Sequence, residues 1–290
     1  GLALCYRASV WNIGAEGQLL MGGVTTTVMA LQFTQSDSAW AMPLTVLAGI
    51  AGGAAWAGLV AFMKIKLNTN ETLTTIMMNY IALNLLLWAV YGPLKDPDGY
   101  NFPESALFGD STLLPILFDG TRLHLGLAFA LLALVATWVL VSKSFIGFQI
   151  QVIGHDPAAA RMAGFSKNKL VLTVLLICGG LSGLAGAVEV AGPIGQLVPH
   201  ISPGYGYSAI IVAFLGRLHP VGITLAGLLM ALIYIGGEMA QITIGLPNAI
   251  TGVFQGLILF YLLSCDVLIR YRIRTDFNFA WFAKPAQGER

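Results

Sequence analysis

The side chains that could perform chemistry in this chain form no catalytic or metal-binding pattern. Its three cysteines, Cys5, Cys178 and Cys265, lie far apart and match neither a disulfide framework nor a zinc site. No nucleophile elbow and no phosphate-binding loop occurs, and His200 between two prolines is typical of a loop histidine. The sequence therefore predicts no enzyme, no bound metal and no cofactor.

Polar side chains between apolar segments indicate a different chemistry, the passage of a polar solute. The stretch 12–18 reads NIGAEGQ and places one carboxyl, Glu16, beside the amides of Asn12 and Gln18. Polar groups at membrane depth must face protein or water. Glu16 has two interpretations: it lines a pathway, or it lies at the cytoplasmic boundary, where it pairs with Arg7 or caps the next helix.

Further polar positions follow along the chain. Thr72, Thr75 and Asn79 share one face of a predicted helix, which suits either a polar solute or interhelical hydrogen bonding. Asn70 and Glu71 just before it are typical of a helix cap. Broken backbone is predicted at 192–193 and 202–204, and transporters build sites at such breaks. The candidate pathway residues are Asn12, Glu16, Gln18, Thr75, Asn79, Glu189, Glu238 and Gln241.

The composition is that of an integral membrane protein. Of the 290 residues, 57% are hydrophobic and only 10% are charged, and mean hydropathy is +0.77. An average soluble domain is roughly 25% charged. The 15 basic and 14 acidic residues leave a net charge of +1, so no nucleic-acid partner is expected. The expected surroundings are a lipid bilayer.

The apolar stretches predict an all-α, polytopic transmembrane bundle of about eight spans plus a partial N-terminal helix. One segment, 205–216, is too short to cross alone and must be short or broken. The run at 1–5 is expected to end a helix that begins upstream. The predicted segments are 17–34, 43–63, 72–91, 123–141, 170–190, 205–216, 221–238 and 248–269.

Basic residues predict the orientation. Thirteen of the 15 Lys and Arg fall in alternate connections and the two chain ends, whereas the opposite connections hold only Lys95 and Arg122. Cytoplasmic loops carry the excess of positive charge. We therefore expect a transmembrane domain over 1–275 and a cytoplasmic tail over 276–290, with the C-terminus inside.

The long loop 92–122 and two ridges of glycines each favour a particular structural role. The long outer loop 92–122 contains four prolines and predicts a fixed, irregular cap, either a passive connector or a docking surface for an outside partner. Gly49 and Gly53, and likewise Gly179, Gly183 and Gly186, form ridges of small residues that predict close helix packing.

The inner loop 143–169 encodes a short helix with its own start and stop. Asp156 suits the N-cap, Pro157 the first turn and Gly164 the position after the C-cap. A helix this short needs a partner, and Ala160, Met162, Ala163 and Phe165 offer one an apolar surface. A helix lying in the lipid interface is the alternative, but large anchoring side chains such as Trp and Leu are lacking.

Four stretches resemble the permease subunit of an ATP-binding cassette importer, in the nucleoside and simple-sugar branch related to ribose and branched-chain amino-acid permeases. They are 12–18 with 19–23, then 70–82, 154–164 and 204–222. The motif NIGAEGQ is more similar to the nucleoside branch than to the ribose branch. One departure is His155-Asp156, where relatives more often carry Gly or Ala and then Asn.

The resemblance implies a mechanism in which a solute-binding protein delivers ligand outside and two permease subunits, identical or mixed, enclose the pathway. Two separate ATPase subunits drive transport, since this chain has no Walker motif. It also implies the bacterial plasma membrane as location and an upstream segment before Gly1. The stretch 154–164 is implied to insert into the ATPase through Gly154, Asp156, Pro157, Ala159, Ala160, Arg161, Ala163 and Gly164. The rival class is an ion-coupled transporter or channel that uses Glu16, Glu189 or Glu238 as its ion site.

Overall fold

The computed structural model describes residues 1–270 except 35, 37, 119, 122, 246 and 248. The chain divides into a first unit, Gly1–Ile233, and a second, Tyr234–Arg290, and each is considered by itself. The tail expected over 276–290 lies outside the described residues. Within the described ranges every named element is helical, and the pair Ile116 and His124 forms an isolated bridge.

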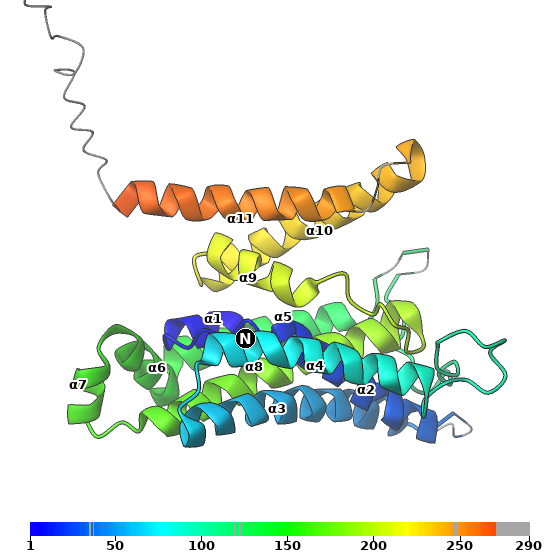
Figure 1. Cartoon of the computed structure of the whole chain (residues 1–290), viewed down its shortest axis with the longest axis horizontal. Coiled ribbons are helices and arrows are strands. Elements are labelled where there is room, and N and C mark those ends of the chain that lie inside the picture. Colours follow the sequence, from blue (N-terminus) through cyan, green and yellow to red (C-terminus); the bar gives the residue numbers. More distant parts are fainter. Residues whose placement is uncertain are drawn as a thin grey trace, which may run out of the picture. The chain divides into compact units, whose positions relative to one another are not determined.

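The helices follow the predicted apolar stretches closely (Figure 1). In chain order they are α1 Leu2–Arg7, α2 Ala15–Gln32, α3 Ala41–Leu67, α4 Glu71–Tyr91, α5 Gly126–Lys143, α6 Phe145–His155, α7 Pro157–Met162, α8 Lys167–Glu189, the π-helical turn η1 Val190–Ile194, α9 Tyr205–Leu215, α10 Pro220–Ile244 and α11 Ala249–Arg270. Helix α6 was not predicted. It starts at Ser144, whose Oγ accepts a hydrogen bond from the Gly147 amide at 3.1 Å.

Five of the described helices are long and apolar enough to cross a membrane: α3, α4, α5, α8 with η1, and α10. Helix α9 is a shorter apolar helix, as its predicted length required. Helix α2 is not among the five, because Glu16, Gln18 and a run of threonines dilute its apolar residues. By length and composition the structure therefore identifies a membrane protein with several spans.

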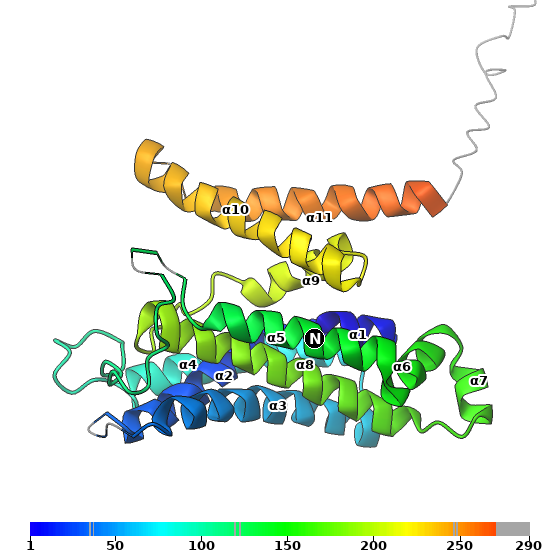
Figure 2. The same cartoon turned by 180° about the vertical axis from the view of Figure 1, so that it is seen from behind.

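Glycines hold α2, α3 and α8 together at the centre of the first unit, where these helices lie side by side (Figures 1 and 2). A Cβ atom on Gly183 would meet the Gly49 carbonyl oxygen and would come within 2.9 Å of the Gly53 Cα. A Cβ on Gly53 would meet the Gly179 carbonyl oxygen, and one on Gly186 would meet the Leu19 carbonyl oxygen. Only glycine permits these backbones to approach so closely, so the predicted packing role of the ridges is confirmed.

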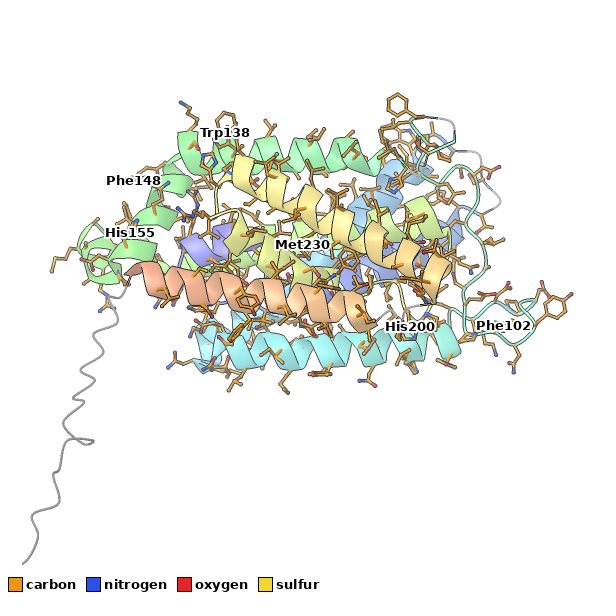
Figure 3. The ribbon with its side chains drawn as sticks, turned by 90° about the horizontal axis from the view of Figure 1, so that it is seen from above. Phe102, Trp138, Phe148, His155, His200 and Met230 are labelled. Atoms are coloured by element: carbon orange, nitrogen blue, oxygen red, sulfur yellow. The ribbon has the colours of Figure 1, made fainter. Side chains whose placement is uncertain are left out.

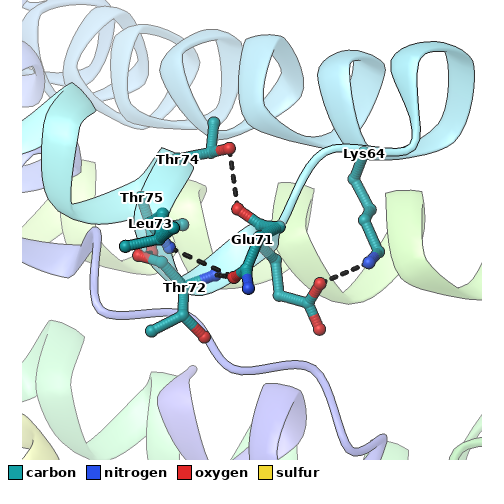
Figure 4. A network of polar contacts seen from close by, with 7 residues as sticks. Lys64, Glu71, Thr72, Leu73, Thr74 and Thr75 are labelled. Atoms are coloured by element: carbon teal, nitrogen blue, oxygen red, sulfur yellow. Dashed lines mark hydrogen bonds and ion pairs between the residues drawn. The ribbon is translucent and has the colours of Figure 1, made fainter.

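The turn between α3 and α4 is closed by local polar contacts (Figure 4). The Asn70 side chain accepts hydrogen bonds from the Thr72 and Leu73 amides at 3.0 and 3.3 Å. Glu71 forms an ion pair with Lys64 in the last turn of α3. The predicted cap is confirmed, and it fixes where α4 begins.

The loops 143–169 and 92–122, predicted to be inner and outer, lie at opposite ends of the first unit. In Figure 3, Phe148 and His155 mark one end, whereas Phe102 and His200 mark the other. The predicted outer loop is therefore separated from the short helix α7 by the length of the long helices.

Candidate functional site

The NIGAEGQ stretch folds into a buried polar network at the start of α2. Asn12 and Gln18 are fully buried, and their side-chain amides face each other, with Asn12 Nδ2 3.4 Å from Gln18 Oε1. Asn12 Nδ2 also donates to the Cys178 sulfur of α8 at 3.3 Å, and Asn12 Oδ1 accepts from the Gly14 amide at 2.8 Å. The network joins the start of α2 to α8.

Helix α4 is joined to the same turn by two of its predicted pathway residues. Thr75 Oγ1 accepts from the Ile13 amide at 3.2 Å. Asn79 donates to the Ile13 carbonyl oxygen at 2.9 Å and accepts from the Gly17 amide at 2.9 Å. These contacts support the interhelical hydrogen-bonding alternative for the polar face of α4.

Glu16 joins α2 to the first turn of α9. Its Oε2 accepts from the Gly206 amide at 2.7 Å, and the carboxylate also receives a hydrogen bond from Ser202. Helix N-termini present unpaired N–H groups, so a carboxylate there is stabilised. The alternative in which Glu16 pairs with Arg7 does not occur, because Arg7 donates to the Leu218 carbonyl oxygen at 2.8 and 3.2 Å. Glu16 caps α9, rather than the helix in which it lies.

Sequence reasoning missed three polar partners of this network: Cys178, Ser202 and Tyr207. The Tyr207 hydroxyl accepts from Asn79 Nδ2 at 3.2 Å. Tyr207 lies in the stretch 204–222 and Ser202 in the predicted break. The sequence therefore marked both regions but not the hydrogen bonds that these two residues form. No local signal links Cys178 to Asn12, because 166 positions separate them.

The remaining predicted pathway residues lie elsewhere. Glu189, half-buried at the end of α8, lines a cavity of 610 Å³ within the first unit. Glu238 and Gln241 are exposed on the part of α10 that belongs to the second unit. The structure therefore brings together Asn12, Glu16, Gln18, Thr75 and Asn79, but it does not place Glu189 with them.

The short helix α7 has the start and stop that its sequence predicts. Asp156 Oδ1 accepts from the Ala158 and Ala159 amides at 2.8 and 3.1 Å. At the other end the Phe165 amide donates to the Ala160 carbonyl oxygen, and the Gly164 amide donates to that of Arg161, both at 3.0 Å. Gly164 has φ of +78°, which completes a Schellman stop. Helix α7 is therefore capped at both ends by its own residues.

The outward face of α7 differs from the expected one. Ala160 is buried, and Phe165 packs edge-on against Phe145 and Phe148 of α6. These two residues anchor α7 to its own chain. The buried Ala160 therefore does not offer the expected surface to a partner, whereas Phe165 is only half-buried. Met162 is 91% exposed, whereas Gly154 packs on the carbonyl of Arg7 at the end of α1.

The described part of the predicted outer loop 92–122 is fixed by contacts with other segments, as its prolines predicted. Its Phe108 amide donates to the Gly195 carbonyl oxygen at 2.9 Å, and Gln196 donates to Glu104 at 2.9 Å. His124 accepts from the Gly126 amide through Nδ1, and burial lowers the pKa of its imidazole, which favours the neutral ring. Tyr100 and Phe102 remain 94% and 63% exposed, so the cap presents aromatic side chains.

The two interpretations of Glu16 are separated by a pair of substitutions. We expect Glu16→Ala to lower the free energy of unfolding by about 1.5–3 kcal/mol, because the Gly206 amide loses a charged acceptor in a buried position. Glu16→Gln retains an acceptor oxygen and should recover most of that loss. Denaturant unfolding in detergent micelles measures both. Equal destabilisation by both variants would contradict the capping role.

Helical elements throughout the described residues, with several helices long and apolar enough to cross a membrane, define the class: a multi-pass membrane protein. The family described as the permease component of branched-chain amino acid transport systems matches residues 1–263. The chain belongs to this family.

Named relatives share most of the chain. It is 36% identical to a glucose ABC transporter permease protein of Haloferax volcanii, over 96% of this chain and 76% of the relative. It is 33% identical to a guanosine ABC transporter permease protein of Bacillus subtilis, over 91% and 76%. It is 28% identical to a nucleoside ABC transporter permease protein of Lactococcus lactis, over 90% and 73%. No solved structure matches.

Proposed function

We propose that this chain forms the translocation pathway of an ATP-binding cassette importer for a nucleoside or a simple sugar. The permease family supports the role in transport, and the relatives named for glucose, guanosine and nucleosides support the solute class. A nucleoside and a sugar both present hydroxyl groups without requiring a charged partner. The chain would work in the plasma membrane with a second permease subunit, identical or different.

The observation that carries this proposal is the self-capped helix α7. Helices of fewer than about three turns are marginal in water unless they are capped or packed. Here Asp156 and Gly164 fix both ends, and Ala160 and Phe165 anchor the inner side. The exposed side therefore presents Met162 on a rigid support, as a contact for a separate ATPase subunit requires. The ATPase supplies the energy, since a solute alone shifts an equilibrium only by its own preference.

The proposed topology has eight spans plus the partial helix α1, with α2 and α9 counted among them and the C-terminus in the cytoplasm. The basic residues of the connections favour this orientation. Helix α2 is polar at its first turn, but there its polar groups are paired inside the protein, as membrane depth requires.

For the pathway, we propose two groups with different roles. The hydrogen bonds of Asn12, Glu16, Gln18, Thr75 and Asn79 favour a positioning role that holds α2, α4, α8 and α9 in place. Glu189, Glu238 and Gln241 are the proposed solute contacts. At the outer side, the fixed loop with exposed Tyr100 and Phe102 is the proposed docking surface for a solute-binding protein.

Reconstitution tests this function. In proteoliposomes that contain the permease, its ATPase subunits and the binding protein, we expect ATP-dependent uptake of radiolabelled guanosine or glucose. Omitting the ATPase or replacing ATP by a non-hydrolysable analogue should abolish uptake. Uptake by the permease alone in response to a proton gradient would overturn the proposal in favour of an ion-coupled transporter.

A further inference from the structure

The 610 Å³ cavity of the first unit is a groove that runs along α5. Its lining extends from Gly126 to Ser142, or about 24 Å at 1.5 Å per helical residue. That length approaches the thickness of a bilayer's hydrocarbon core, roughly 30 Å. The walls are mostly apolar, formed on α5 and α8 by Phe129, Ala130, Ala133, Leu134, Trp138, Leu181, Leu184 and Val188.

The groove has basic residues at one end and a carboxyl group at the other. At one end the lining includes Arg7, Ser142 and His219, and the exposed Lys143 and Arg217 lie next to lining residues. At the other end it includes Glu189, the one carboxylate among the described lining residues. Gly126 and Val188 meet at that second end, since a Cβ on Gly126 would contact the Val188 side chain.

The Arg7 guanidinium lies at the basic end of the groove and uses only some of its N–H groups in hydrogen bonds within the chain. Its Nε and Nη2 donate to the Leu218 carbonyl oxygen, which fixes the guanidinium beside the groove. A guanidinium has five N–H donors, and among the described residues Nη1 has no acceptor, so it is available for a ligand. Arginine suits phosphate because its planar fork matches two oxygens at once.

We propose that this groove binds an anionic phospholipid, with the phosphate at Arg7 and one acyl chain along α5 and α8. The apolar walls suit an acyl chain, and the basic end attracts a negative headgroup. The basic residues Arg7 and His219 line the end opposite Glu189, so the headgroup is favoured at the Arg7 end. The proposed site is separate from the buried polar network and from α7, and it shares only Glu189 with the proposed solute contacts.

Two matched substitutions on α5 test the acyl site. Ala133 lines the groove, whereas Ala136 on the same helix is exposed and does not line it. The permease is purified with its ATPase subunits from membranes that contain phosphatidylglycerol, and retained lipid is counted by native mass spectrometry. We expect Ala133→Trp to reduce bound phosphatidylglycerol about tenfold and Ala136→Trp to leave it unchanged. Equal retention in the two variants would overturn the proposal.

The headgroup contact is tested with Arg7→Gln, and Lys66→Gln serves as a control at a basic position outside the groove. We expect Arg7→Gln to remove the preference for phosphatidylglycerol over phosphatidylcholine, and Lys66→Gln to keep it. An unchanged preference in Arg7→Gln, or no preference in the unsubstituted protein, contradicts the headgroup assignment.

A measurement on the unsubstituted complex avoids any folding defect. Phosphatidylglycerol with a photoreactive acyl chain should label peptides that contain 129–138 and 181–188, and excess unlabelled phosphatidylglycerol should compete. Labelling spread evenly over the exposed helices would show bulk lipid only and overturn the proposal. So would a disulfide between two Ala133→Cys permease subunits, because a second subunit would then fill the groove.

Discussion

Replacing Gly183 by leucine should prevent the permease from reaching its folded state. A Cβ on Gly183 would meet the backbone of Gly49 and Gly53 on α3. Gly22 of α2 also lies against Gly183, since a Cβ on Gly22 would meet the Gly183 backbone. Overpacking a core commonly costs about 1–3 kcal/mol, and here neither backbone can give way without separating three helices. We expect a loss of at least about 3 kcal/mol in the free energy of unfolding.

The measurement is the yield of monodisperse protein in detergent, followed by denaturant unfolding of any that remains. Gly227→Leu is the matched control, since no atom lies within 4 Å of a Cβ at Gly227 on α10. Both substitutions improve helix propensity by up to about 1 kcal/mol, so that effect cancels in the comparison. Similar yields of the two variants would contradict the close-packed arrangement of α2, α3 and α8.

Met162→Glu should abolish ATP-driven uptake while leaving the permease folded. Met162 is 91% exposed on α7, so the substitution itself is expected to change stability by no more than about 0.5 kcal/mol. An exposed, flexible thioether adapts well to an apolar pocket, whereas a carboxylate there must lose its hydration. A contact of this kind is worth about 2 kcal/mol or more, which corresponds to a loss of roughly 30-fold in ATPase binding.

Uptake into proteoliposomes and co-purification of the ATPase measure this effect. The control is Gln151→Glu, which adds the same charge at an exposed position of α6. Full uptake by Met162→Glu would contradict the coupling role of α7. A charged residue at Ala160 or Gly164 would be a weaker test than Met162→Glu, because Ala160 is buried and Gly164 has a positive φ.

The helical elements could be predicted because their signals are local. The start and stop of α7 depend on Asp156 and Gly164, each within a turn of the groups that they fix. The ridges that begin at Gly49 and Gly179 repeat at helical spacings of four and, from Gly183 to Gly186, three, which already indicated close packing. Helix α6 was missed because its Ser144 cap follows directly on α5 without a glycine or proline between them.

The candidate site could be predicted only as a collection of residue types. The sequence marked Asn12, Glu16 and Asn79 as polar groups that need partners at membrane depth, but it could not say which partners. In the structure they bind other helices of the chain, which favours positioning over solute contact for these three. The expected outward role of Ala160 failed for the same reason, since only the folded chain brings α6 beneath α7.

By itself, the sequence determined that this chain is helical, apolar and suited to a membrane. The signals for these properties, hydropathy and helix caps, depend on residues only a few positions apart. Only the tertiary structure decided that the Glu16 carboxylate caps α9 at Gly206, 190 positions away. Burial makes that pairing necessary, since a polar group without water must find a partner inside the protein. Its choice of partner is set by which helices pack together, and glycine contacts over long separations decide that packing.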